Sequence, residues 1–233
     1  MPLVQNPSLG GGQVAMLQTV TQLSSADILA LASTGKQLVA APGAGKIQVP
    51  FGFYYSLAFG THPYVVVGGS IDNLAPAYGL NGDQIGASVL NVVAQGTNSV
   101  AYGAGVLSPF GGPFAQDVNQ PIVLFGSNYN AGPIVTATLG AGGLGYAAND
   151  TGTITNGTND ATYKVLTVGA GGAVLTFQIT GAGTACTIAN GNATVTGGAQ
   201  PGVGVGFTVN ITAVQIGDGT LKVVTYYQII PVP

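Results

Sequence analysis

Few side chains in this sequence could do acid–base, nucleophilic or metal chemistry. The chain has seven Asp, four Lys, one His and one Cys, and it has neither Glu nor Arg. His62 is the only imidazole, and it stands in a Thr-His-Pro sequence without an Asp beside it. A catalytic His needs a partner that orients it. The sequence therefore predicts a turn residue at His62, and it predicts no catalytic residue elsewhere.

The other polar groups lack the spacing of a metal or disulfide site. The Asp residues do not follow the pattern of a calcium-binding loop. We expect them in turns, as in Asp218-Gly219, and an ion held at an interface between subunits is the alternative. Cys186 is alone, which excludes an internal disulfide and a Cys-based metal site, and its surroundings indicate a small buried apolar residue. The sequence thus predicts no metal and no cofactor.

Two glycine-rich stretches match phosphate-binding motifs in part. A phosphate loop needs Gly five residues before its Gly-Lys pair and Ser or Thr after the Lys. In the stretch Pro42–Lys46 these positions are Ala40 and Ile47. The stretch Gly140–Gly145 has the spacing of a dinucleotide motif, but that motif needs a helix to follow, and no helical pattern does. We expect no nucleotide site.

The surface composition indicates an assembled protein. Charged residues make up 5% of the chain, against about 25% in a typical soluble domain. Solvent-exposed apolar surface usually marks contacts, so we expect other subunits to cover much of this surface, the alternative being a secreted β protein with a polar surface. Four scattered Lys and a net charge of −3 do not fit nucleic-acid binding. The sequence also predicts no signal peptide and no membrane span.

Two segments with a strand period dominate the pattern. In Lys46–Phe59 and in Thr220–Ile230, large apolar residues alternate with smaller or polar ones, and we expect both strands in one sheet. Pro50 predicts an edge or a bulge. The remaining extended runs are separated by turns, and one short helix is expected at Ser24–Ala32. The fold class predicted is all-β, a jelly-roll or β-sandwich.

Adjacent tyrosines occur in both dominant strands. Alternation sends Tyr54 and Tyr55 to opposite faces, and it does the same for Tyr226 and Tyr227. We expect one tyrosine of each pair in the core. Its neighbour is then a candidate for a contact between subunits or for stacking on a glycan.

The pattern divides the chain into three parts. We predict an N-terminal arm at residues 1–16, a β-sandwich or jelly-roll domain formed by residues 17–139 together with 214–233, and an inserted Gly- and Thr-rich β module at residues 140–213. The module contains a degenerate duplication, whose copies begin with Gly-Ala-Gly at positions 140 and 181.

Several local expectations concern the first domain. Strands are predicted at Tyr64–Val67 and Ala87–Ala94, and a loop-rich segment at Ile71–Ile85. The stretch Gln95–Gln120 is predicted to be a long irregular loop, and loops of that length usually serve an interface.

Three motifs resemble a group of tailed-bacteriophage virion proteins. They are Leu23-Ser-Ser-Ala-Asp-Ile-Leu-Ala-Leu31, Gln37-Leu-Val-Ala-Ala-Pro-Gly-Ala-Gly-Lys-Ile47 and Gly217-Asp-Gly-Thr-Leu-Lys-Val-Val-Thr-Tyr-Tyr-Gln-Ile-Ile230. The resemblance covers residues 18–135 and 214–233, and the inserted module looks like modules of phage fibre and decoration proteins. It implies a trimeric jelly-roll capsid cement, or decoration, protein on the capsid surface of the virion, bound to the major capsid protein. It transfers no functional residues.

The sequence leaves two functional hypotheses. The first is a non-enzymatic cement protein that stabilises the phage head through contacts with several subunits, for which residues 1–16 and 95–120 are the candidate contacts with the shell. The alternative is a host-recognition module of head- or tail-fibre type, in which residues 140–213 bind glycans. A depolymerase would need paired carboxylates, which the sequence does not offer.

Overall fold

The structure is a computed structural model, and it describes residues 15–69, 71–79, 83–105, 117–196 and 204–232. These residues are almost entirely β, with one short α-helix, so the predicted fold class is confirmed. The chain forms two compact units. The first, here called the jelly-roll unit, consists of residues 1–63, 71–128 and 218–233. The second, the barrel unit, consists of residues 64–70 and 129–217.

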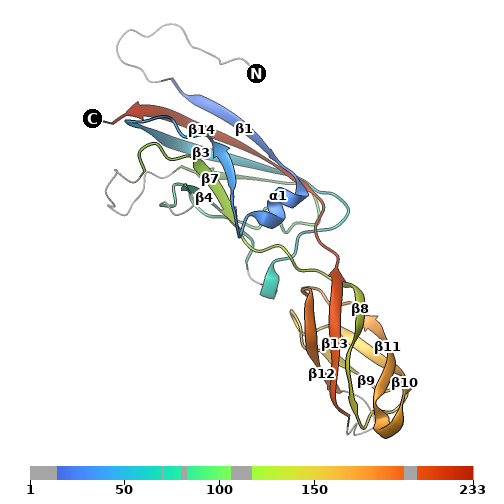
Figure 1. The fold of residues 1–233 in the computed structure, drawn as a ribbon. Helices are drawn as coiled ribbons and strands as arrows, with labels where there is room; N and C mark the ends of the chain where they lie inside the picture. Colours follow the sequence, from blue (N-terminus) through green and yellow to red (C-terminus); the bar gives the residue numbers. More distant parts are fainter. Residues whose placement is uncertain (1–14, 70, 80–82, 106–116, 197–203, 233) are drawn as a thin grey trace. The chain divides into compact units, whose positions relative to one another are not determined.

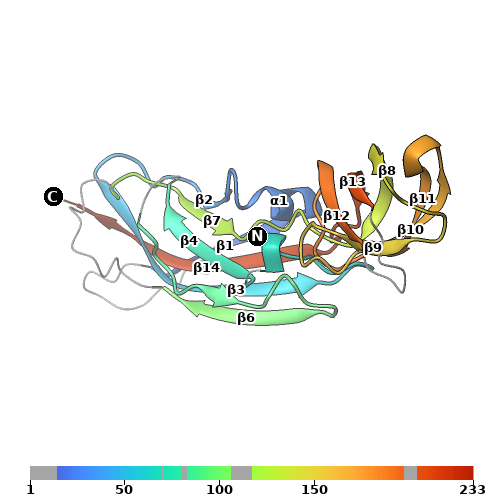
Figure 2. The ribbon, with the colours of Figure 1, turned by 90° about the horizontal axis from the view of Figure 1, so that it is seen from below.

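The jelly-roll unit is a sandwich of two four-stranded sheets, with strand orders β1-β14-β3-β6 and β2-β7-β4-β5. Successive strands mostly alternate between the sheets, which is the jelly-roll arrangement. Figure 1 shows these strands, and Figure 2 shows β6 at the edge of its sheet beside β3. The described elements of this unit are β1 (Leu17–Leu23), α1 (Ser25–Ala30), β2 (Lys36–Val39), β3 (Lys46–Ala58), β4 (Asn73–Tyr78), β5 (Val89–Leu90), β6 (Ser99–Ala104), β7 (Ile122–Gly126) and β14 (Thr220–Pro231).

The two dominant strands pair as the sequence predicts. Strands β3 and β14 are antiparallel neighbours, with Tyr55 opposite Val223 and Tyr54 opposite Val224. Tyr55 and Tyr227 are buried, whereas Tyr54 and Tyr226 are half-buried on the other face, so one tyrosine of each pair does enter the core. Of the two alternatives predicted at Pro50, an edge strand or a bulge, the structure has the bulge. Strand β3 is an interior strand, and its register shifts between Pro50 and Gly52.

The predicted helix forms because its first turn is capped. The Ser24 side chain accepts a hydrogen bond from the Asp27 amide, and the Asp27 carboxylate accepts one from the Ser24 amide, which makes a capping box. Lys36 Nζ lies 2.7 Å from Asp27 Oδ1, and this bond, followed by the Ser24 amide, lowers the pKa of Asp27. Ile28 and Leu31 are fully buried, so the helix covers one side of the core.

The barrel unit is built from a six-stranded antiparallel sheet, with strand order β11-β10-β9-β12-β13-β8. Its ends approach each other: Ile134 N donates to Ala182 O at 2.7 Å, and Gly145 N donates to Gly171 O at 2.8 Å. The sheet is therefore nearly closed. The described elements of this unit are η1 (Val67–Gly69), β8 (Ile134–Leu144), β9 (Thr151–Ile154), β10 (Thr162–Val168), η3 (Ala170–Gly172), β11 (Val174–Gly181), β12 (Ala189–Thr196) and β13 (Val205–Val214).

The strand order of the sheet repeats between its two halves, as a duplication would produce. If β8, β9 and β10 change places with β11, β12 and β13, the sheet has the same strand order when it is read from its other end. The central neighbours are β9 and β12, one from each half. Tyr163 of β10 and Phe207 of β13 are the corresponding aromatic residues, and their rings meet edge to face with centroids 5.0 Å apart. Each half thus contributes one aromatic side chain to a shared core.

Four local expectations are wrong. The stretch predicted to be irregular between residues 95 and 120 contains β6, and the segment predicted to be loop-rich contains β4. The predicted strand over residues 87–94 is reduced to Val89–Leu90. Residues 64–67 form only isolated bridges at Val65 before η1. In each case pairing with a partner strand decided the outcome, and local propensity does not carry that information.

The two compact units begin and end at other residues than the predicted parts. Strand β8, whose first half we assigned to the sandwich, lies in the barrel unit, which starts at Tyr129 and also takes in residues 64–70. The predicted arm lies outside the described residues up to position 14, and so do residues 106–116 of the predicted interface loop.

Candidate functional site

The structure brings His62 to an Asp that lies 156 residues away in the chain. Asp218 Oδ1 accepts hydrogen bonds from the backbone amides of Thr61 at 2.8 Å and His62 at 2.9 Å. The Thr61 hydroxyl donates to Asp218 Oδ2 at 2.6 Å, and His62 Nδ1 is 3.5 Å from the same oxygen. Sequence reasoning missed this pair, since only the Asp-Gly turn at residue 218 hinted that the carboxylate would serve the backbone.

In this cluster the Asp218 carboxylate binds the backbone amides of Thr61 and His62 and so fixes the turn, an arrangement that we call the turn clamp. The hydrogen bond from the Thr61 hydroxyl and then that from the His62 amide hold the pKa of Asp218 well below its usual range. A nucleophilic relay needs the imidazole between the carboxylate and the hydroxyl, and here the hydroxyl contacts the carboxylate directly. A Cβ at Gly60 would come within 2.2 Å of Asp218 Oδ1, so the clamp also requires glycine at that position.

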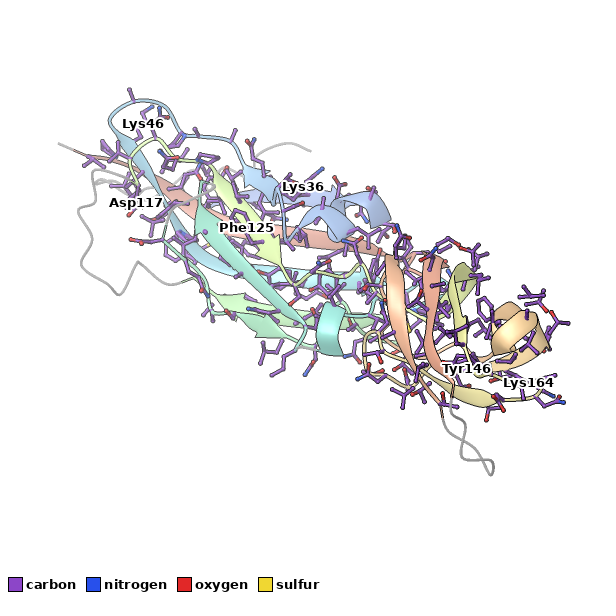
Figure 3. All side chains as sticks on the ribbon, turned by 60° about the horizontal axis from the view of Figure 1, so that its bottom comes forward. Lys36, Lys46, Asp117, Phe125, Tyr146 and Lys164 are labelled. Atoms are coloured by element: carbon purple, nitrogen blue, oxygen red, sulfur yellow. The ribbon has the colours of Figure 1, made fainter. Side chains whose placement is uncertain are left out.

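Asp117 is the most deeply buried carboxylate without a full set of partners. Its side chain is 3% exposed, and its Oδ1 has no hydrogen-bond partner among the described residues. Burial, followed by the charge of Asp83, raises its pKa. Asp117 and Lys46 lie at the same end of the jelly-roll unit (Figure 3). The described residues contain no group of three or more His, Cys or acidic side chains that could hold a metal.

Two further Asp residues hold turns, as predicted. Asp72 accepts hydrogen bonds from the amides of Val93 at 2.6 Å and Ala94 at 2.9 Å. Asp160 accepts from the hydroxyls of Thr158 and Thr184, which lower the pKa of its carboxyl. These carboxylates therefore organise the backbone within their own units.

The two glycine-rich stretches do not lead into helices. Residues 42–45 form the approach to β3, where Gly43 N donates to Asn119 Oδ1 at 2.9 Å. Residues 140–144 lie within strand β8, so no helix N-terminus faces this stretch. Cys186 is fully buried, and burial followed by the charge of Asp160 raises the pKa of its thiol.

The jelly-roll unit exposes an apolar face on the sheet β1-β14-β3-β6. Register and alternation place twelve side chains on the side of this sheet that faces away from the sandwich core. We call this set the outer sheet face: Gln18, Val20, Gln22, Gly52, Tyr54, Ser56, Val100, Tyr102, Ala104, Lys222, Val224 and Tyr226. Val20 is 51% exposed, Val100 65% and Tyr102 62%.

The barrel unit exposes aliphatic side chains at one of its ends. Leu144 pairs with Val205 in register. Val195 near the end of β12 and Leu175 near the start of β11 lie at the same end, because neighbouring strands are antiparallel. All four are exposed. We call Leu144, Leu175, Val195 and Val205 the barrel-end patch.

The aromatic side chains of the barrel unit lie mainly in its core. Phe207 packs edge to face against Tyr146, Tyr163 and Phe177, with ring centroids 5.0 to 5.8 Å apart. Tyr64 and Tyr129 are buried against each other in the same unit. Among these rings in its described part, only Phe177 is partly exposed, so these rings offer a glycan little surface for stacking.

The chain matches no protein-family model, no curated protein and no solved structure. Within the described residues, no helix has both the length and the apolar character that a membrane span requires.

Proposed function

We propose that the protein is a non-enzymatic virion structural protein of the capsid cement or decoration type. It would bind the major capsid protein at the capsid surface of a tailed bacteriophage, as a homotrimer, and stabilise the head by adding contacts across several shell subunits. The three motifs that resemble phage virion proteins support this proposal, and the jelly-roll fold is the one that the resemblance implies.

The observation that carries the proposal is the exposed, nearly uncharged apolar surface. The outer sheet face has one charged residue, Lys222, and the barrel-end patch has none. Burying apolar surface contributes about 25 cal/mol for each Å² removed from water, without any covalent chemistry. Contacts of this kind depend little on ionic strength, because salt screens charges and not apolar burial.

The host-recognition hypothesis has less support. Glycan-binding surfaces commonly offer aromatic rings for stacking. The rings of the barrel unit lie mainly in its core, around Phe207. Binding of the chain to cells or to isolated glycans, without binding to capsids, would favour this second function.

The test uses capsid shells that lack the protein, assembled from the major capsid protein of the phage whose genome encodes the chain. The full chain is added and sedimented with the shells, in low and in high salt, and tails from the same phage serve as the control. We expect saturable binding to shells that changes little with salt. Absence of binding to shells at tens of micromolar protein would contradict the proposal.

A further inference from the structure

We infer that the outer sheet face is the surface through which copies of this chain contact one another. This inference rests on the homo-oligomer part of the proposed function and assigns it a location. It commits to a second copy as the occupant of the face.

Large side chains of the outer sheet face lie side by side across the whole sheet. Val20, Val224, Tyr54 and Tyr102 form one row across all four strands, in the register of the sheet. Val224 is only 7% exposed although it points away from the sandwich core. Its register partners on the two neighbouring strands are Val20 and Tyr54. The row is therefore a continuous apolar strip that needs only a flat partner to be covered.

The ring of Tyr102 lies over Gly52. A Cβ at Gly52 would come within 2.0 Å of the Tyr102 hydroxyl oxygen and 2.5 Å of Cζ. The same hydroxyl donates to Phe51 O at 3.3 Å. These contacts orient a ring that is 62% exposed, so it loses less conformational freedom when a partner buries it.

The outer sheet face carries almost no charge. None of the seven Asp residues belongs to it, and Lys222 is its only charged side chain. A neighbouring copy that lies on this face therefore meets no carboxylate of the face. A charged partner of another kind would find a single Lys to pair with, so the face lacks the complementarity that would select such a partner.

The outer sheet face spans five residues on each of the four strands, at 18–22, 52–56, 100–104 and 222–226. At about 3.4 Å per residue and about 4.8 Å between strands, it covers roughly 330 Å². That is less than half of the ~800 Å² that each partner buries in a standard protein interface, so the outer sheet face forms the centre of a larger contact.

The test compares matched charge substitutions in the two units of the full chain. The double variant Val20→Lys/Val100→Lys places two cations on the outer sheet face. The control Val195→Lys/Val205→Lys changes two valines of similar exposure, 59% and 67%, on the barrel-end patch. Molar mass is measured by light scattering and sedimentation over a range of concentrations in low and high salt, and near-UV circular dichroism checks folding.

We expect the wild-type chain to be oligomeric in both salt conditions. The outer-face variant should raise the dissociation constant at least about 100-fold, because the contact would have to bury two unpaired cations, and the control should change it less than about threefold. The milder variant Val100→Ser, which adds no charge, should weaken association by about tenfold, and it keeps the test valid if the double variant folds poorly.

Three results would overturn the inference: a wild-type monomer at every concentration, an outer-face variant that associates like the wild type, or a control that dissociates equally. Shell binding, the other part of the proposed function, has a separate readout, because the wild-type chain can bind capsid shells in any of these cases. Conversely, an oligomer that is broken by the outer-face variant but never binds shells would uphold the inference and contradict the proposed function.

Discussion

The two units share a poor supply of charges but differ in how many aromatic side chains they leave outside the core. The jelly-roll unit buries Tyr55 and Tyr227 but places Tyr54, Tyr102 and Tyr226 on the outer sheet face. In the barrel unit, Tyr163 and Phe207 meet in the core. A nearly closed sheet of six strands has a narrow interior that rings can fill, whereas a sandwich buries only the side chains of its two inner faces.

The outsides of the units differ accordingly. Pairs of threonines hydrogen-bond across strands of the barrel unit, as in Thr162 with Thr180 and Thr167 with Thr176, at 2.9 and 2.6 Å. Such pairs satisfy their own polar groups. Outside the barrel-end patch, the barrel unit also exposes single aliphatic side chains such as Val135 and Ile188, whereas the jelly-roll unit exposes a row of apolar side chains in register. Low charge is therefore common to both units, and exposed aromatic side chains distinguish the outer sheet face.

The largest expected effect concerns the core of the barrel unit. Replacing Phe207 by Ala removes the ring that three other rings contact, and the cavity should destabilise the protein by about 3–5 kcal/mol. Thermal and denaturant unfolding of the full chain would measure this. The control is Val205→Ala on the same strand, 67% exposed, for which we expect a change within about 0.5 kcal/mol. Equal effects of the two variants would break the comparison.

The next effect concerns a buried polar network that also belongs to the barrel unit. The Asn192 side-chain amide donates to Ala189 O at 2.8 Å and Val209 O at 2.9 Å, and its oxygen accepts from Asn156 at 2.7 Å. Asn192→Ala should leave these partners unsatisfied and cost about 1–3 kcal/mol. Hydrogen exchange of the β12 and β13 amides would locate the loss, and unchanged exchange there would contradict the assignment.

A smaller effect is expected from a methyl group added to the outer sheet face. Gly52→Ala should lift the Tyr102 ring, at a cost of at most about 1 kcal/mol, because that side chain is exposed and can swing away. In a Tyr102→Ala background the same change should be neutral or stabilising by up to about 1 kcal/mol, since Ala suits a strand better than Gly. The double-mutant cycle measures the coupling, and additivity would show that the ring does not cover Gly52.

The smallest effect is a dependence of stability on pH. It comes from one carboxylate in each unit, Asp218 and Asp160. The folded pKa values of Asp218 and Asp160 lie below the ordinary value of 3.8, so the folded state binds fewer protons than the unfolded state. Their contribution to stability is therefore full above that value and is lost as pH falls through the folded pKa. Asp218→Asn should flatten the acid limb of the unfolding curve more than Asp160→Asn. The opposite order would contradict the clamp at His62.

The strand pattern predicted more of the fold than of the surface. Alternation in Lys46–Phe59 and Thr220–Ile230 was enough to place both strands in one sheet and to divide their tyrosines between core and outside. The weaker strands β4 and β6 were predicted as loops, because Pro76 and the glycines near residue 103 mask their pairing with β7 and β3. Their strand state comes from neighbours that the sequence does not reveal.

The sequence by itself determined that this is an all-β protein with few charges and a capped short helix, because periodicity and capping residues are local features of the chain. Only the tertiary structure decided which faces are covered. It brought Asp218 to Thr61 and His62, buried the rings around Phe207, and left Val20, Val100 and Tyr102 on one open sheet. Burial depends on contacts between residues far apart in the chain, and these exist only once the sheets have formed.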